Sequence, residues 1–395
     1  MQIVASYPLW GAVSMGVVTR VARFARSLLA TFPTRLRRVS TLREPFMTGL
    51  KQPLLGIVAT AIIIAISLGL ISLFSFEVFS GWLSIGLMCL IPAQIAVAVL
   101  WQTKHPAWAA NRRQPLKGIL LILVTLLVGA IVVPAYHRLA GGGLGPSPMF
   151  IQCVIVSVVV MFWFAIMWGG WPFNAVMKSP VIAGFATMAV SYGINLLLFR
   201  VLFNYEFMKG APVYVESLDP HGMFNAWNVL VFYVTSLSMM FLTLHFDLWP
   251  LTKSRAVMRQ PVLGLVWTTI VLMLGTILYL IGTRALQMDV VVFLVRVPIP
   301  FIFGTIVVLN MLQNSLFANV AQPAKGIANA SAAAVIGSAL AFLYTRLTGL
   351  VTGTLSSGPP AYESEIWLAS ALLSVTFPFL IFYAEFLGFW PLKSN

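Results

Sequence analysis

Amide side chains inside long apolar stretches are the groups in this sequence best suited to bind a small solute. The densest set is Asn310, Gln313 and Asn314, whose i, i+3, i+4 spacing predicts one face of a helix. Asn329 is expected at a comparable depth in the next apolar segment. Polar groups at membrane depth cost free energy, so they are natural candidates for functional residues.

Three titratable residues are expected at the same level as these amides: His245, Asp247 and Glu385. Together the two sets predict an inward-facing polar cavity, in which the amides coordinate a solute and Glu385 or Asp247 accepts a proton. The alternative is that the amides join neighbouring helices and the charged groups lie in water at the interface. The sequence leaves both interpretations open.

Arginines recur where alternate apolar segments end, on the side opposite the amides. A partial ring of guanidinium groups there would attract anionic solutes to an outer mouth. The alternative is structural, because arginine at a helix C-terminus complements the helix dipole and reaches the lipid headgroups. Arg296 differs, because it is expected about two turns inside an apolar segment that also contains Pro298 and Pro300. The four recurring residues are Arg138, Arg200, Arg284 and Arg346.

Signatures of catalysis and cofactor binding are missing from the sequence. It has no phosphate-binding loop, nucleophile elbow or paired carboxylates, and its four histidines lack HxxxH or HExxH spacing. We therefore predict no catalytic residue, metal or cofactor. A haem-bearing or other intramembrane enzyme remains an alternative, which a visible absorption spectrum would detect.

Composition determines the class of protein. Of 395 residues, 60% are hydrophobic and only 9% are charged, whereas a soluble domain carries about 25% charged residues. The net charge of +14 is concentrated at the N-terminus and in short loops, which indicates membrane topology and anionic lipid rather than nucleic acid. Both cysteines fall inside apolar segments, so neither a disulfide nor a zinc site is expected. We predict an all-α, polytopic membrane protein.

Ten apolar segments follow a basic N-terminal arm, residues 1–50, which is expected to lie as an amphipathic helix on anionic lipid or to serve only as a charged tail. Each segment is long enough to cross a hydrocarbon core of about 30 Å. The predicted transmembrane domain is 51–395. Its segments are 53–74, 82–102, 117–136, 148–168, 180–203, 226–246, 261–283, 289–313, 325–345 and 366–387.

The segments pair into five predicted copies of one two-helix unit. Pro261, Gly264, Gly275 and Arg284 recur at identical spacing in two other places, and looser copies begin at Pro53 and Pro180. Small residues three turns apart on one face let helices approach closely in lipid, so the odd-numbered helices are expected to be the inner ones. The repeats are 53–107, 115–172, 180–250, 261–315 and 323–391.

Lysine and arginine predict the orientation. Eighteen of the 24 basic residues lie in the arm or directly after it at Lys51, in the loops that precede each later repeat, or at the C-terminus. The positive-inside rule places these regions, and so both termini, in the cytoplasm of a bacterial inner-membrane protein with all five repeats parallel.

Taken together, these patterns predict a transporter or channel for a small, possibly anionic, solute, with a path between the odd-numbered helices. The alternative is a non-catalytic membrane subunit that anchors a larger complex through other membrane subunits. The sequence does not distinguish a carrier from a channel, and it identifies no solute.

Overall fold

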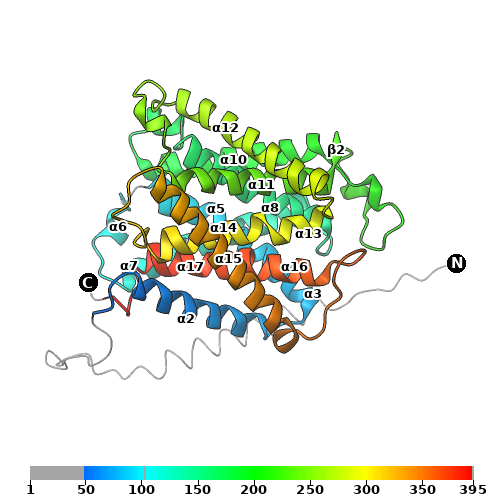
Figure 1. Cartoon of the computed structure of the whole chain (residues 1–395). Coiled ribbons are helices and arrows are strands. Elements are labelled where there is room, and N and C mark those ends of the chain that lie inside the picture. The colour runs from blue at the N-terminus through cyan, green and yellow to red at the C-terminus, as the bar shows by residue number, and fades with distance from the viewer. Residues whose placement is uncertain (1–48, 102–103, 394–395) are drawn as a thin grey trace. The chain divides into compact units, whose positions relative to one another are not determined.

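The computed structural model describes residues 49–101 and 104–393, all within the unit Met47–Asn395. The predicted arm, 1–50, lies almost entirely outside the described residues. Within them, ten helical spans are long and apolar enough to cross a membrane by length and composition, which confirms the predicted number. Figure 1 shows the long helices running alongside one another, with α15 crossing in front of α14.

The odd-numbered spans are long helices that begin just after the repeated prolines. Proline suits the first turn of a helix, where its missing N–H would have no partner. Three of these spans also contain an exposed glycine, at which the helix continues without a break: Gly69, Gly193 and Gly349. The odd-numbered spans are α2 (Leu54–Ile71), α7 (Leu116–Leu139), α10 (Pro180–Leu202), α12 (Val262–Leu280, continued by a π-helical turn, Ile281–Ala285) and α15 (Ala324–Val351).

The even-numbered spans are more irregular, and four of the five end in a π-helical turn. Such turns appear as local bulges and are frequent at functional sites. The even-numbered spans are Phe76–Leu100 (with α3, Phe76–Val78, α4, Ser84–Met88, and α5, Ile91–Ile95), Pro148–Met167 (with α8, Pro148–Phe162), α11 (Ala226–His245), Val290–Met311 (with α13, Val290–Arg296, and α14, Pro298–Ile306) and Glu363–Phe386 (with α16, Glu363–Ala369, and α17, Phe377–Ile381).

Short elements connect the spans on both sides. On one side they are α6 (Ala107–Ala110), α9 (Phe173–Val176) and the 3-10 turn Leu251–Lys253. On the other side, β1 (Phe203–Asn204) pairs in parallel with β2 (Phe224–Asn225) and encloses the 3-10 turns Glu206–Met208 and Glu216–Leu218.

The even-numbered spans form the inner layer, and the prediction that the odd-numbered helices are inner is wrong. In the even spans 56–72% of the apolar window is buried, against 22–44% in the odd spans. Each even span contacts the next even span along the chain, and the tenth contacts the second, so the five close into a ring. Each odd helix has at least one glycine on the face that touches this ring, such as Gly56, Gly264 or Gly326, whereas others, such as Gly193, are exposed.

A repeated glutamine contact attaches the odd helices to the ring. In four places the glutamine before the proline accepts the N–H of the glycine four residues later through Oε1, at 3.0–3.2 Å. Its Nε2 donates, at 2.6–3.1 Å, to a main-chain carbonyl where an even span ends. We call these four residues the glutamine clamps. The clamps and their acceptors are Gln52 with Met311, Gln114 with Phe386, Gln260 with Met167 and Gln322 with His245.

Candidate functional site

An axial cavity of about 430 Å³ lies inside the ring and is lined by all five even-numbered spans. At its mouth each span contributes a residue close to its first turn, so the cavity opens on the side where these spans begin. The positive-inside rule predicts that this side is the outer one. The five mouth residues are Phe76, Ser147, Trp227, Val291 and Ile366.

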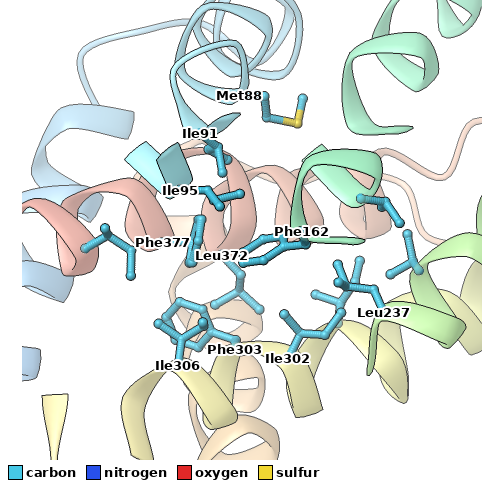
Figure 2. Close-up of a cluster of buried hydrophobic side chains, with 14 of the residues drawn as sticks. Met88, Ile91, Ile95, Phe162, Leu237, Ile302, Phe303, Ile306, Leu372 and Phe377 are labelled. Carbon is cyan, nitrogen blue, oxygen red and sulfur yellow. The ribbon is translucent and has the colours of Figure 1, made fainter. Parts of the chain in front are cut away.

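A cluster of apolar side chains, which we call the plug, forms the floor of the cavity about halfway along the lengths of the even-numbered spans. Figure 2 shows its side chains converging from several helices, with Met88 and Ile91 opposite Phe162 and Ile302. Deeper still, Ile95, Phe303 and Ile306 continue the same cluster, and these three no longer line the cavity. Close packing of such side chains excludes water, so the ring is hollow at one end and closed toward the other.

The cavity wall is mostly apolar, but a few polar groups are fixed in it. Gln152 on α8 is only 2% exposed, and its Oε1 accepts the hydroxyl of Tyr205 at 3.0 Å. Tyr205 is held in turn by Asp219, whose carboxylate oxygens accept its N–H at 3.1 and 3.2 Å. Burial raises the pKa of Tyr205 well above its ordinary value, so the phenol stays protonated and remains a donor.

Two carboxylates line the outer part of the cavity. The Glu365 side chain is buried and accepts the hydroxyl of Ser357 at 2.7 Å and the N–H of Gly358 at 3.1 Å. Glu77 lies on the second span, which neighbours the tenth in the ring, and is exposed. Within the described residues no lysine, arginine or histidine lines this cavity. The mouth therefore favours uncharged or cationic solutes over anions.

The three amides that were predicted at the cytoplasmic end of the eighth span do not share a helix face. The eighth span ends at Met311, and Gln313 and Asn314 follow in a turn with φ of 50° and 54°. The i, i+3, i+4 interpretation is therefore wrong, because the backbone leaves the helix after Met311. Asn314 instead accepts the Nδ2 of Asn329 at 3.3 Å, and Gln313 is exposed.

The other candidates predicted at this end of the spans contact different partners. Asn310 donates to Glu385 at 2.9 Å, which joins the inner ends of the eighth and tenth spans. His245 is buried, and its Nε2 lies 3.0 Å from the Thr305 hydroxyl. Asp247 lies apart, on the exposed turn that follows α11. The amide candidates are therefore held in pairs, Asn310 with Glu385 and Asn314 with Asn329, which fits the structural alternative for the amides.

Asp247 pairs with two groups that precede or begin α15. It accepts Gln322 at 2.8 Å and Lys325 at 3.0 Å. Partial burial by itself raises the pKa of Asp247, but these hydrogen bonds and the Lys325 charge outweigh it and hold that pKa below its usual value. This carboxylate is therefore ionised near neutral pH and ties the sixth span to α15.

The arginines lie on the outside of the fold. Arg138, Arg200, Arg284 and Arg346 are all exposed on odd-numbered helices, and none lines the axial cavity. Arg296 ends α13 beside Pro298 and is also exposed, so it is not the buried arginine that the sequence suggested. Its position at the break between α13 and α14 does agree with the expected proline kink.

Reasoning from the sequence missed the polar group that lines the cavity. Gln152 is an isolated amide in an apolar span, and the same rule that selected Asn310 would have selected it. No sequence signal links it to Tyr205, because their contact spans 53 residues and depends on how the outer loop folds.

A second hollow of about 850 Å³ lies on the outside of the ring, between α10 and α12. We call it the lateral groove. The indole N–H groups of Trp163 and Trp168 both donate to the Thr268 hydroxyl, at 3.1 and 3.3 Å. These three polar groups therefore satisfy one another, and Tyr279 donates to Asn228 at 3.0 Å. Most of the remaining lining, such as Leu198 and Leu272, is apolar.

Comparison with known proteins gives no relative from which to transfer a function. No protein-family model, no curated protein and no solved structure matches this chain.

Proposed function

We propose that this chain is a multi-pass membrane transporter or channel for a small, uncharged solute, and that the solute moves along the axis of the ring of five even-numbered helices. The observation that carries the proposal is the axial cavity, because all five inner spans contribute to one hollow that ends at an apolar plug. A path between the odd helices, as first expected from the glycines, has less support, because those helices lie on the outside.

We further infer that the domain consists of five parallel copies of one hairpin. The glutamine clamps support this, because each links an odd span to the even span three spans earlier in the chain, with the first span counted as following the tenth. The seventh and ninth spans are thus linked to the fourth and sixth, and the first and third to the eighth and tenth. The third copy has Ser179 instead of glutamine, yet its Gly184 packs on Trp101, at the end of the second span, in the equivalent way. Parallel copies and the distribution of basic residues support our further proposal that the chain lies in a bacterial inner membrane with both termini in the cytoplasm.

Transport along this axis requires the plug to open, so in this proposal the plug closes the path on the side that the positive-inside rule predicts to be cytoplasmic. Protein cores switch between discrete packings and do not deform continuously. The Asn310–Glu385 pair joins two inner spans beyond the plug and is a candidate for sensing that change. If transport is coupled to protons at this pair, Glu385→Gln will abolish the pH dependence of uptake while expression is unchanged. Unaltered pH dependence removes Glu385 from that role.

A filling substitution tests the path. Leu237 lines the cavity and lies in the same cluster as Ile302, so the larger side chain of Leu237→Trp should occupy the floor of the cavity. Proteoliposomes with the wild-type chain, the variant or no protein are incubated with a mixed pool of uncharged metabolites, and their contents are measured by mass spectrometry. We expect at least one solute to enter wild-type vesicles faster than both other samples. The proposal fails if no solute distinguishes a folded wild-type chain from empty vesicles.

The lateral groove favours a second candidate function, a membrane subunit that holds a partner helix. A photo-crosslinking amino acid at Leu272, which lines the groove, should then attach to one defined protein in native membranes. The same group at Leu123, which is exposed on α7 outside the groove, serves as the control. Adducts with lipid alone at both positions would exclude this candidate.

A further inference from the structure

One amide in the axial cavity lacks a partner on one of its two ends. Gln152 is 2% exposed and lines the cavity, and within the described residues its Nε2 has no hydrogen-bond partner. A buried donor left unpaired destabilises the folded chain. Native proteins leave few such groups, and each one calls for an explanation such as a ligand or a trapped water.

The outer loop determines which end of this amide remains available. Tyr205 is fully buried and donates its hydroxyl to Gln152 Oε1, and Asp219 holds the Tyr205 main chain. Asp219 also accepts the Tyr214 hydroxyl at 3.1 Å and the His221 N–H at 2.9 Å. Because Tyr205 already donates to Oε1, the end of the amide that remains unpaired is Nε2, a hydrogen-bond donor enclosed in the cavity wall.

The surroundings of that donor define the rest of the ligand. The cavity volume of about 430 Å³ falls within the range of small-molecule sites, about 300–1,000 Å³. Around Gln152 the wall is apolar, with Ile151, Ile155 and Leu230 among its residues. The charged groups in the lining, Glu77 and Glu365, are acidic, so an anion would be repelled.

We propose that the axial cavity binds an uncharged amphiphile, with a hydrocarbon body against the apolar wall and one hydrogen-bond acceptor, such as a carbonyl oxygen, at Gln152 Nε2. This inference rests on the proposed function, since it names the chemical class of the solute. Gln152 acts as the specificity-determining residue, and Tyr205 is the positioning residue that orients its amide.

Three probes of similar length test the assignment: 2-nonanone, which has an acceptor, nonane, which has none, and nonanoate, which is an anion. Binding of tritiated 2-nonanone to the purified full chain in detergent is measured by scintillation proximity, and the other two compete. One hydrogen bond to a buried donor should make the ketone bind about 5- to 10-fold more tightly than nonane. Nonanoate should compete more weakly than either.

Gln152→Met removes the donor at nearly constant volume, so the preference for the ketone should fall to about one while nonane binding is retained. Gln94→Met is the matched control, because Gln94 is equally buried on an inner span but does not line the cavity. Tyr205→Phe should weaken the preference in part. An unchanged ketone-to-nonane ratio in Gln152→Met would overturn the inference and leave a trapped water as the partner.

The outcome is independent of the transport screen. A chain that binds 2-nonanone through Gln152 but moves no uncharged solute keeps this binding site and refutes transport. A chain that moves a solute but shows no preference for the ketone keeps transport and refutes the role of Gln152.

Discussion

The closest helix crossing in the fold allows a quantitative prediction. Gly337 on α15 and Gly304 on α14 face each other, and a Cβ added to Gly337 would overlap the main-chain carbonyl of Pro300. A Cβ added to Gly304 would lie 2.7 Å from the Gly337 nitrogen and overlap the Ala333 carbonyl. Both obstacles are main-chain atoms, so only a separation of the two helices can relieve the overlap.

Gly337→Ala should therefore destabilise the chain. Overpacking costs about 1–3 kcal/mol, and we expect the upper end, about 3 kcal/mol, because no side chain can move aside. Alanine recovers about 1 kcal/mol through its helix propensity, which leaves a net loss of about 2 kcal/mol. The free energy of unfolding is measured by titrating the purified protein in mild detergent with sodium dodecyl sulfate.

Gly193→Ala is the matched control. Gly193 holds the second small position of its repeat, as Gly337 does, but nothing lies within 4 Å of its added Cβ. This variant should be unchanged or more stable by up to about 1 kcal/mol. The double variant Gly304→Ala/Gly337→Ala should cost less than the sum of its parts, because one separation relieves both overlaps. If Gly337→Ala unfolds within about 0.5 kcal/mol of Gly193→Ala, the reasoning from close approach is refuted.

Three further measurements test other parts of the structure. Gln114→Leu removes both hydrogen bonds of one glutamine clamp and should lower the free energy of unfolding by about 1–3 kcal/mol in the same titration. Ser179→Ala, at the position without a clamp, should lower it less. Equal losses in the two variants would contradict the clamp. The pKa of Asp247 is lowered in the folded chain, so its stabilisation is complete above the unfolded pKa of about 3.9 and is lost as pH falls through the lower folded value. Asp247→Asn should thus be less stable than wild type at pH 7, by under about 1 kcal/mol for so exposed a pair. The difference should shrink as pH falls below the unfolded pKa of about 3.9 and vanish below the lower folded value; a difference independent of pH would exclude the ion pair. Single-cysteine variants Lys209→Cys and Arg255→Cys should react with an impermeant thiol reagent from opposite faces of the membrane. Labelling of both from the same face would contradict the parallel-hairpin model.

Part of the candidate site follows from local sequence, and part does not. The polar pairs at the inner ends were predictable as polar residues at similar depth, because depth follows from position along a span. Their partners were not, since Asn310 meets Glu385 across 75 residues. The prediction that Asn310, Gln313 and Asn314 share a helix face was wrong because the chain adopts positive φ just after Met311. No feature of these side chains indicates that change in the backbone.

The sequence by itself determined the number of spans, the prolines at which they begin and the glycines at which they touch. These are local properties: span length follows from hydrophobic runs, and close approach follows from the absence of a side chain. Tertiary structure alone decided which helices are inner. The exposed first and third spans have a mean hydropathy of 2.8 and the buried second and eighth spans 2.3, because lipid is as apolar as a protein core. Hydropathy therefore cannot separate the two layers, and only the closed ring of even spans reveals the cavity and the amide of Gln152 in its wall.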